Sequence, residues 1–253
     1  MPDATDSFQD LRLPLLMTRR DFLIGAAGGL ATRVRIKALA FDAFAIFDPR
    51  SVVVLADSLY PGAGLSDEWR TRQFEYTWLR VAAHRYADFW QVTEDALVFA
   101  TNRLKLTMSG RNRAMLMNEY LRLKPWPDVI PSLESMKRAG LRLGCLSNFT
   151  RNMLAANVDG AGLQGLFEQV LSSDQRKTYK PDPRAYQLGL DAFKVKREEV
   201  LFVAFAGWDA AGAKSFGYPT FWVNRQGLPA EEMGVRADGA GETLADLVKF
   251  LTG

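Results

Sequence analysis

Short apolar runs and helical periodicity alternate along most of this chain. The runs typical of buried strands fall at residues 36–42, 141–146, 169–172, 200–205 and 220–223. Helical spacing fills the intervals between them, at residues 128–139, 150–158, 183–194 and 209–216 and from residue 243 onward. Strands that alternate with helices favour a parallel sheet covered on both faces, so the pattern predicts an α/β fold with a Rossmann-like core.

One long stretch interrupts this alternation directly after the first strand. Its periodicity is helical throughout, with helices expected at residues 51–60, 66–85, 93–106 and 111–123. Ser66 is the expected N-cap of the second helix, because serine favours that position and two acids follow it. We therefore expect a helical cap subdomain, residues 49–125, inserted into a core built from residues 36–48 and 126–253.

The first 35 residues differ from the rest of the chain. Arg19 and Arg20 precede an apolar stretch at residues 24–31, a combination that resembles a bacterial twin-arginine export signal. That stretch is shorter than the roughly 20 apolar residues of a membrane-spanning helix, so stable membrane insertion is not expected. The segment predicts periplasmic export. The alternative is a disordered tail on a cytoplasmic protein.

Composition excludes several kinds of site. The net charge of +3 is not gathered into a basic block interleaved with aromatic residues, so nucleic acid is not an expected partner. Cys145 is the single cysteine and lies in an apolar run, which indicates a buried structural thiol and excludes an internal disulfide. His84 is the single histidine and has no cysteine or histidine near it, so neither a zinc centre nor a Ser-His-Asp triad is expected.

Polar residues stand at the ends of four predicted strands. Asp42 closes the first strand, Ser147 follows the second, Lys180 comes after the third, and Asp209 follows the fourth. Each residue alone is an ordinary turn or helix-capping residue. Ligands of open α/β sheets bind at the carboxyl ends of the strands, so these four side chains are expected to converge on one crevice.

The order of these four residues resembles the haloacid dehalogenase superfamily, and within it the L-2-haloacid dehalogenases, over residues 36–251. The stretches that carry the closer resemblance are Trp69-Arg70, Glu75-Tyr76-Thr77-Trp78-Leu79-Arg80, Thr93-Glu94-Asp95-Ala96-Leu97, Leu146-Ser147-Asn148, Tyr179-Lys180-Pro181-Asp182 and Trp208-Asp209-Ala210-Ala211-Gly212-Ala213. The resemblance implies hydrolytic, metal-independent conversion of short-chain (S)-2-haloacids to (R)-2-hydroxyacids. No cofactor is implied. The partners are a small 2-haloacid substrate and, by the same resemblance, a second copy of the chain in a homodimer.

The resemblance also implies a role for each catalytic residue. Asp42 attacks the halogen-bearing carbon and forms an ester, while Lys180 keeps the Asp42 carboxylate ionised. Asp209 then activates the water that hydrolyses the ester. Six residues correspond to the substrate-binding positions of the family: Arg70, Phe89, Ser147, Asn148, Tyr186 and Trp208.

The resemblance implies a different role in substrate binding for each group of these six residues. Arg70 would receive the halide or the substrate carboxylate, because a guanidinium group suits an anion. Ser147 would bind the substrate carboxylate, with Asn148 in support. Phe89 and Trp208 would form apolar walls that exclude water, and a tyrosine at position 186 would brace the lysine.

Departures from the family pattern keep two alternatives open. Phe44 and Phe205 stand where the superfamily's phosphatases carry acidic residues, so a magnesium-dependent phosphatase is disfavoured. Ala204 and Ala206 replace a serine and an asparagine that precede the Trp-Asp pair, and the usual threonine after the nucleophile is missing. These losses favour, as the second alternative, a catalytically weakened protein that binds small carboxylates.

Overall fold

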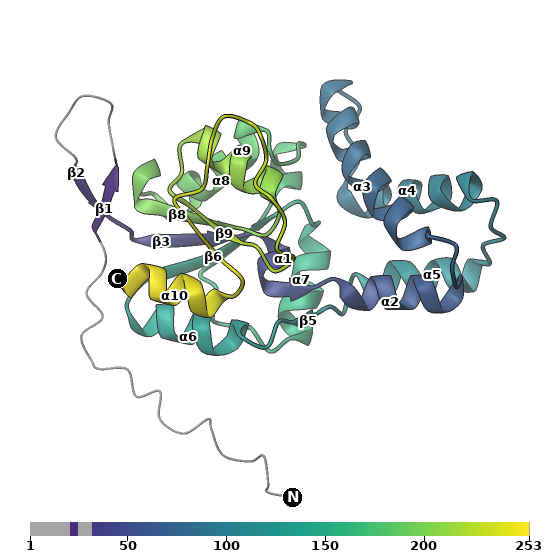
Figure 1. The fold of residues 1–253 in the computed structure, drawn as a ribbon, viewed down its shortest axis with the longest axis horizontal. Coiled ribbons are helices and arrows are strands. Elements are labelled where there is room, and N and C mark those ends of the chain that lie inside the picture. Colours follow the sequence, from purple (N-terminus) through teal and green to yellow (C-terminus); the bar gives the residue numbers. More distant parts are fainter. Residues whose placement is uncertain (1–20, 25–31, 253) are drawn as a thin grey trace, which may run out of the picture.

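The computed structural model describes residues 21–24 and 32–252 (Figure 1). Most of the predicted export signal, including both arginines, lies outside the described residues. At the backbone level, β1 (Asp21–Ile24) and β2 (Thr32–Arg35) pair as a two-stranded antiparallel sheet, which lies at the end of the core away from the cap.

The core is a six-stranded parallel sheet, so the predicted α/β class is confirmed. Its order is β10-β9-β8-β3-β6-β7, with β3 (Ala38–Phe41), β6 (Arg142–Ser147), β7 (Gln169–Ser172), β8 (Val200–Ala204), β9 (Thr220–Val223) and β10 (Gly239–Gly241). The edge strand β10 was not predicted, because its Gly-Ala-Gly sequence contains no apolar run.

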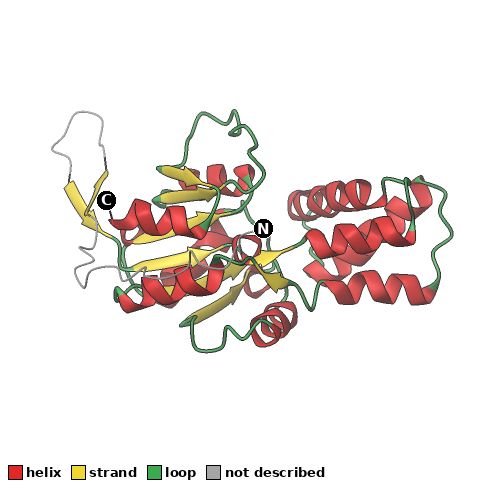
Figure 2. Cartoon of the chain, turned by 60° about the horizontal axis from the view of Figure 1, so that its bottom comes forward, coloured by secondary structure: helices red, strands yellow, loops and turns green. Residues whose placement is uncertain are grey.

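Helices cover both faces of this sheet, as Figure 2 shows. Side chains alternate between the faces along each strand. Leu39 and Phe41 pack in one buried cluster with residues of α6 (Val129–Arg138), α7 (Arg151–Gly160) and α10 (Leu244–Thr252). Ala38 and Ala40 pack in the other with residues of α8 (Pro183–Phe193) and α9 (Gly207–Phe216). The central strand is therefore buried on both sides, and its carboxyl end opens toward the cap.

The cap is connected to the core through a short antiparallel pair, β4 (Phe47–Asp48) and β5 (Lys124–Pro125). Between these strands lie α2 (Arg50–Leu59), α3 (Leu65–Ala82), α4 (Phe89–Arg103) and α5 (Gly110–Glu119). Helix α4 begins four residues earlier than predicted, because the Asp88 side chain accepts a hydrogen bond from the Gln91 N–H at 2.9 Å.

The prediction that Ser66 caps α3 is wrong. Gly64 is the N-cap, with a φ of 69° that glycine adopts without strain. Ser66 lies inside the first turn, and its hydroxyl donates a hydrogen bond to Asp57 at 2.9 Å.

Polar contacts fix the cap against the core. The Tyr86 hydroxyl donates to Asp174 Oδ1 at 2.8 Å, and the Tyr179 hydroxyl donates to the Ala87 carbonyl at 2.5 Å. On the core side, the Asn157 side chain donates to the Tyr120 carbonyl at 2.8 Å. These contacts hold the cap near the strand ends that carry the polar residues. Within the described ranges, no helix combines the length and hydropathy needed to cross a membrane.

Candidate active site

Asp42 lies where the central strand β3 ends and the four-residue helix α1 (Ala43–Ile46) begins. Its backbone N–H continues the ladder to β8 by donating to the Val203 carbonyl at 2.9 Å. One carboxylate oxygen, Oδ2, accepts a hydrogen bond from the Phe44 N–H at 3.0 Å. Asp42 therefore does cap a turn, and the cap uses one oxygen, which leaves the other for a second partner.

That second partner is Lys180, which forms the centre of the site. Its ammonium group lies 2.7 Å from Asp42 Oδ1 and 2.6 Å from Asp209 Oδ2, and its side chain is almost completely buried. The backbone N–H of Lys180 donates to Asn148 Oδ1 at 2.9 Å, and the Ser173 hydroxyl donates to the same oxygen at 3.1 Å. The amide of Asn148 thus supports the loop that carries the lysine into the crevice.

Burial and charge oppose each other at these groups. Burial alone would lower the pKa of Lys180, but the carboxylates of Asp209 and Asp42 raise it above its ordinary value. Burial raises the pKa of Asp209 to about 6, an effect that the Asp42 charge strengthens and Lys180 partly offsets. The lysine is therefore charged at neutral pH, whereas Asp209 titrates close to neutrality.

Tyr186 does not brace the lysine as the resemblance implied. Its hydroxyl donates instead to Asp209 Oδ1 at 2.7 Å, so it orients the second carboxylate. Burial raises the pKa of Tyr186 well above its ordinary value, which keeps the hydroxyl a donor. A Cβ on Gly212 would lie 2.6 Å from this hydroxyl and 2.6 Å from Pro181, so only glycine fits there.

Ser147 is buried beside this network, but its hydroxyl is turned toward the backbone. Ser147 Oγ accepts a hydrogen bond from the Phe149 N–H at 3.0 Å. The Phe149 carbonyl in turn accepts from the Ser172 hydroxyl at 2.6 Å. The turn after β6 is therefore held by its own hydroxyl groups, at the place where the resemblance expects a substrate carboxylate.

The other three predicted substrate-binding residues surround the cap–core junction. Arg70, on α3, lines a junction pocket of about 480 Å³. Phe89 is buried, and its ring centroid lies 5.4 Å from that of Phe149. The half-buried Trp208 packs against Phe74 of α3, with ring centroids 5.6 Å apart. None of the three takes part in the hydrogen bonds that join Asp42, Lys180 and Asp209.

Phe149 is a residue that the sequence analysis missed. Its buried ring contacts Phe44 of the core and two cap rings, Phe89 and Tyr120, with centroid distances of 5.2, 5.4 and 6.3 Å. A large aromatic residue directly after the Ser-Asn turn was the available signal, since turns favour small or polar residues. Phe149 therefore joins aromatic rings of the core and the cap.

Apolar rings occupy the positions where related phosphatases carry acids. The ring centroids of Phe44 and Phe205 are 5.9 Å apart, and Phe205 stacks on Trp126. In the part of the chain that the structure describes, no three His, Cys, Asp or Glu side chains are grouped as metal ligands. The Lys180 ammonium bridges the two carboxylates of Asp42 and Asp209.

The remaining candidates from the sequence lie elsewhere. Burial raises the pKa of the Cys145 thiol to about 12, which fits a structural residue and not a nucleophile. His84 is exposed on the cap.

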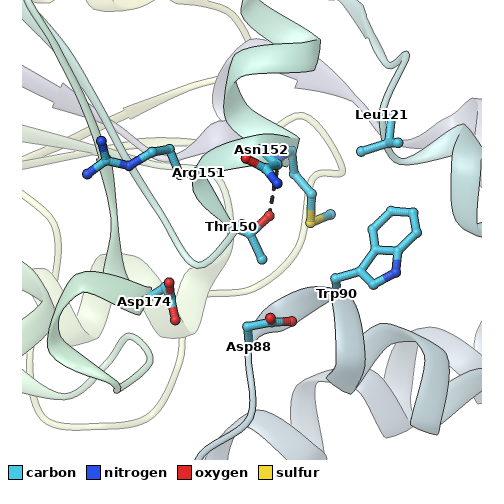
Figure 3. A pocket seen from close by; sticks show the side chains of 8 residues that line it. Asp88, Trp90, Leu121, Thr150, Arg151, Asn152 and Asp174 are labelled. Carbon is cyan, nitrogen blue, oxygen red and sulfur yellow. Dashed lines mark hydrogen bonds between the residues drawn. The ribbon is translucent and has the colours of Figure 1, made fainter.

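A second pocket, of about 410 Å³, opens at another part of the junction (Figure 3). Asp88 and Trp90 of the cap face Thr150, Arg151 and Asp174 of the core across it. Asp42, Lys180 and Asp209 line neither this pocket nor the 480 Å³ junction pocket.

The comparisons with known proteins agree with this geometry. The family model of the haloacid dehalogenase-like hydrolases matches residues 66–217. An (S)-2-haloacid dehalogenase of Pseudomonas sp. (strain YL) is 44% identical over 218 residues, which are 85% of this chain and 94% of the relative. Haloacetate dehalogenase H-2 of Moraxella sp. (strain B) is 41% identical over 207 residues, which are 81% of this chain and 92% of the relative.

A solved structure is similar over the same region. The L-2-haloacid dehalogenase of Xanthobacter autotrophicus, with chloropropionic acid covalently bound, matches with a TM-score of 0.79 and 34% identity. The match covers 86% of this chain and 99% of that one. The resemblance drawn from the motifs is thereby confirmed, and the chain belongs to the haloacid dehalogenase-like hydrolases.

Proposed function

We propose that this protein is an (S)-2-haloacid dehalogenase, which hydrolyses short-chain (S)-2-haloacids to (R)-2-hydroxyacids through an ester on Asp42. The observation that carries the proposal is the buried Lys180 ammonium bridging the Asp42 and Asp209 carboxylates. Support also comes from the names of the relatives and from the relative with covalently bound chloropropionic acid.

In the first step, a carboxylate oxygen of Asp42 displaces the halide. A new carbon–oxygen bond forms as the carbon–halogen bond breaks, which inverts the carbon. The halide leaves as a stable anion, so no proton donor is needed, in keeping with the rings of Phe44 and Phe205. The Lys180 ammonium donates a hydrogen bond to Asp42 Oδ1 at 2.7 Å and so holds the nucleophile in place.

In the second step, water attacks the Asp42 carboxyl carbon and gives its proton to Asp209. The negative charge that develops on Asp42 needs hydrogen-bond donors. Asp42 has one donor on each oxygen, Lys180 Nζ on Oδ1 and the Phe44 N–H on Oδ2. Whichever oxygen carries the ester, the other retains a donor. The bond between the Asp42 carboxyl carbon and the substrate oxygen then breaks, and the departing alkoxide takes the proton back from Asp209, which releases the hydroxyacid. Loss of the remaining carboxyl proton to solvent restores the Asp42 carboxylate.

A second candidate function is a weakened enzyme that retains carboxylate binding. Ala204 and Ala206 supply no side-chain hydrogen bonds, and the Lys180 ammonium has hydrogen bonds only to Asp42 and Asp209 among the described residues. A water molecule attacking the ester has correspondingly few side chains to orient it. This observation favours slow ester hydrolysis and, in the extreme, a protein that binds acids without turnover.

The identity of the nucleophile is tested by one turnover in heavy-oxygen water. We expect the label to enter the Asp42 carboxylate before it enters product, and the ester to accumulate as intact protein heavier by one acyl group. Asp42→Asn should lower the rate of ester formation by about 10⁴-fold or more, because a neutral amide is a poor nucleophile. Halide release and mass spectrometry measure both steps.

The matched control is wild-type protein treated with EDTA, whose activity should be unchanged. Label that appears first in the product would show that water attacks the substrate directly. Activity lost to EDTA and restored by magnesium would support the phosphatase alternative, and tight carboxylate binding with no adduct would support the binding protein.

The pH dependence of ester hydrolysis is tested separately. Asp209 has a pKa of about 6 in the free protein, partly because the Asp42 charge raises it. Esterification removes that charge, so the pKa of Asp209 should fall and the base should remain ionised below pH 6. The rate of ester breakdown should therefore stay level at pH 6 and decline only at lower pH, in rapid-quench measurements. Asp209→Asn should abolish this decline of the rate at low pH. A decline that already begins at or above pH 6 would contradict the role of Asp209 as the base.

We also propose that the protein is exported to the periplasm. The support is Arg19-Arg20 followed by the apolar stretch at residues 24–31. Arg19→Lys combined with Arg20→Lys should leave the protein in the cytoplasm, as measured by fractionation of expressing bacteria. The control is a cytoplasmic marker enzyme. Wild-type protein confined to the cytoplasm would support the alternative location.

A homodimer is a further proposal, which the family resemblance favours. The cap leaves large apolar side chains exposed on two helices, Val54 on α2 and Leu79 on α3, at 66% and 57% exposure. Sedimentation equilibrium should give twice the chain mass of 28.3 kDa, and Leu79→Glu combined with Val54→Glu should shift it toward the monomer. Wild-type protein that sediments as a monomer at micromolar concentration would contradict the proposal.

A further inference from the structure

The nucleophile stands at the start of a helix that cannot complete its own hydrogen bonds. Helix α1 has four residues, and the carbonyls in the last turn of a helix have no partner within it. Its sequence, Ala-Phe-Ala-Ile, supplies no polar side chain that could bind them. The Phe44 N–H of this helix donates to Asp42 Oδ2 at 3.0 Å, so the orientation of the carboxylate depends on how firmly α1 is held.

Three carbonyls of α1 accept hydrogen bonds from two residues that lie far along the chain. The Trp126 indole N–H donates to the Phe44 carbonyl at 3.0 Å, and the Trp126 backbone N–H donates to the Ile46 carbonyl at 3.0 Å. The Arg225 guanidinium donates to the Ala45 carbonyl at 3.2 Å. Trp126 and Arg225 together therefore supply the donors that the end of α1 lacks.

These two donors are held in contact with each other. The Arg225 guanidinium lies 4.5 Å from the centroid of the Trp126 ring, a distance suited to cation–π attraction. Both of its amino groups donate to the Asp128 carboxylate at 2.9 Å, and the Arg225 side chain is almost completely buried. The Phe205 ring stacks on Trp126, with centroids 6.4 Å apart. Both donors are thus fixed by packing before they reach α1.

We propose that Trp126 and Arg225 are positioning residues for the reaction at Asp42, which act through α1. They hold the Phe44 N–H where it orients the Asp42 carboxylate for attack and where it remains a donor to Asp42 during ester hydrolysis. This role requires no contact with the substrate. The inference rests on the proposed dehalogenase function and deepens it. Because misplacing a reacting group by about 1 Å can lower a rate about 100-fold, loss of this support should slow the chemistry and spare substrate binding.

Trp126→Phe tests the proposal, because it removes the indole N–H and keeps an aromatic ring beside Phe205. In single turnovers of (S)-2-chloropropionate, the rates of ester formation and ester breakdown should fall at least about tenfold. The Kd of unreactive propionate, measured by calorimetry, should stay within about twofold of the wild-type value, since the residue does not bind substrate. A residue that only stabilised the fold would lower the midpoint of thermal unfolding and leave these rates unchanged.

The matched control is Trp69→Phe. The Trp69 indole N–H donates to the Thr93 carbonyl at 2.8 Å inside the cap, so this variant loses the same kind of buried hydrogen bond without touching α1. Its rate of ester breakdown should stay within about twofold of the wild-type rate, because α1 keeps its donors. An equal loss of rate in Trp69→Phe and Trp126→Phe would overturn the inference, since it would reflect general destabilisation.

Arg225→Met is a second variant that leaves Trp126 in place, and it decides the question should Trp126→Phe fail to fold. It removes the donor to the Ala45 carbonyl, so we expect the same slowing of both steps with the Kd of propionate unchanged. Wild-type rates in the folded variants, or a weaker Kd with unchanged rates, would overturn this inference alone. Neither halide nor ester from wild-type protein would overturn the proposed function, and this inference with it.

Discussion

The burial of one ammonium group between two carboxylates is the constraint on which the rest of the site depends. A charge removed from water is costly unless it is paired, and breaking a buried pair typically costs about 3–5 kcal/mol. Lys180 meets this requirement with Asp42 and Asp209 together. The sheet order brings the two acids together, because β3 and β8 are neighbours and each acid lies just beyond the carboxyl end of its strand.

A second set of contacts fixes this charged group in place. The Asn148 side chain accepts a hydrogen bond from the backbone N–H of Lys180. The Tyr186 hydroxyl donates to Asp209 Oδ1, whereas Lys180 binds the other oxygen, Oδ2. Gly212 lets α9 approach Pro181 and the tyrosine closely enough for that bond to form. The stability of the charged network therefore depends on packing between α8 and α9 as much as on the charges themselves.

The α/β class and five of the six core strands could be predicted from the sequence, whereas β10 could not, because its Gly-Ala-Gly sequence contains no apolar run. Asp42 and Lys180 could be found because polar residues that end buried strands stand out against apolar runs. The partner of Tyr186 could not be found, since the direction of a hydroxyl depends on packing between two helices. Phe149 was also missed, because its contacts come from the other subdomain and leave no local pattern. Ser66 was misassigned because Gly64 offered a strain-free cap two residues earlier.

The aromatic residues around the network limit the chemistry that it can perform. Phe44 and Phe205 place rings where a proton donor or a metal ligand would otherwise stand, so a leaving group that must be protonated has no donor from those positions. A halide departs as an anion and needs none. Apolar walls and a nucleophile paired with Lys180 therefore favour the same reaction, displacement at carbon by a carboxylate.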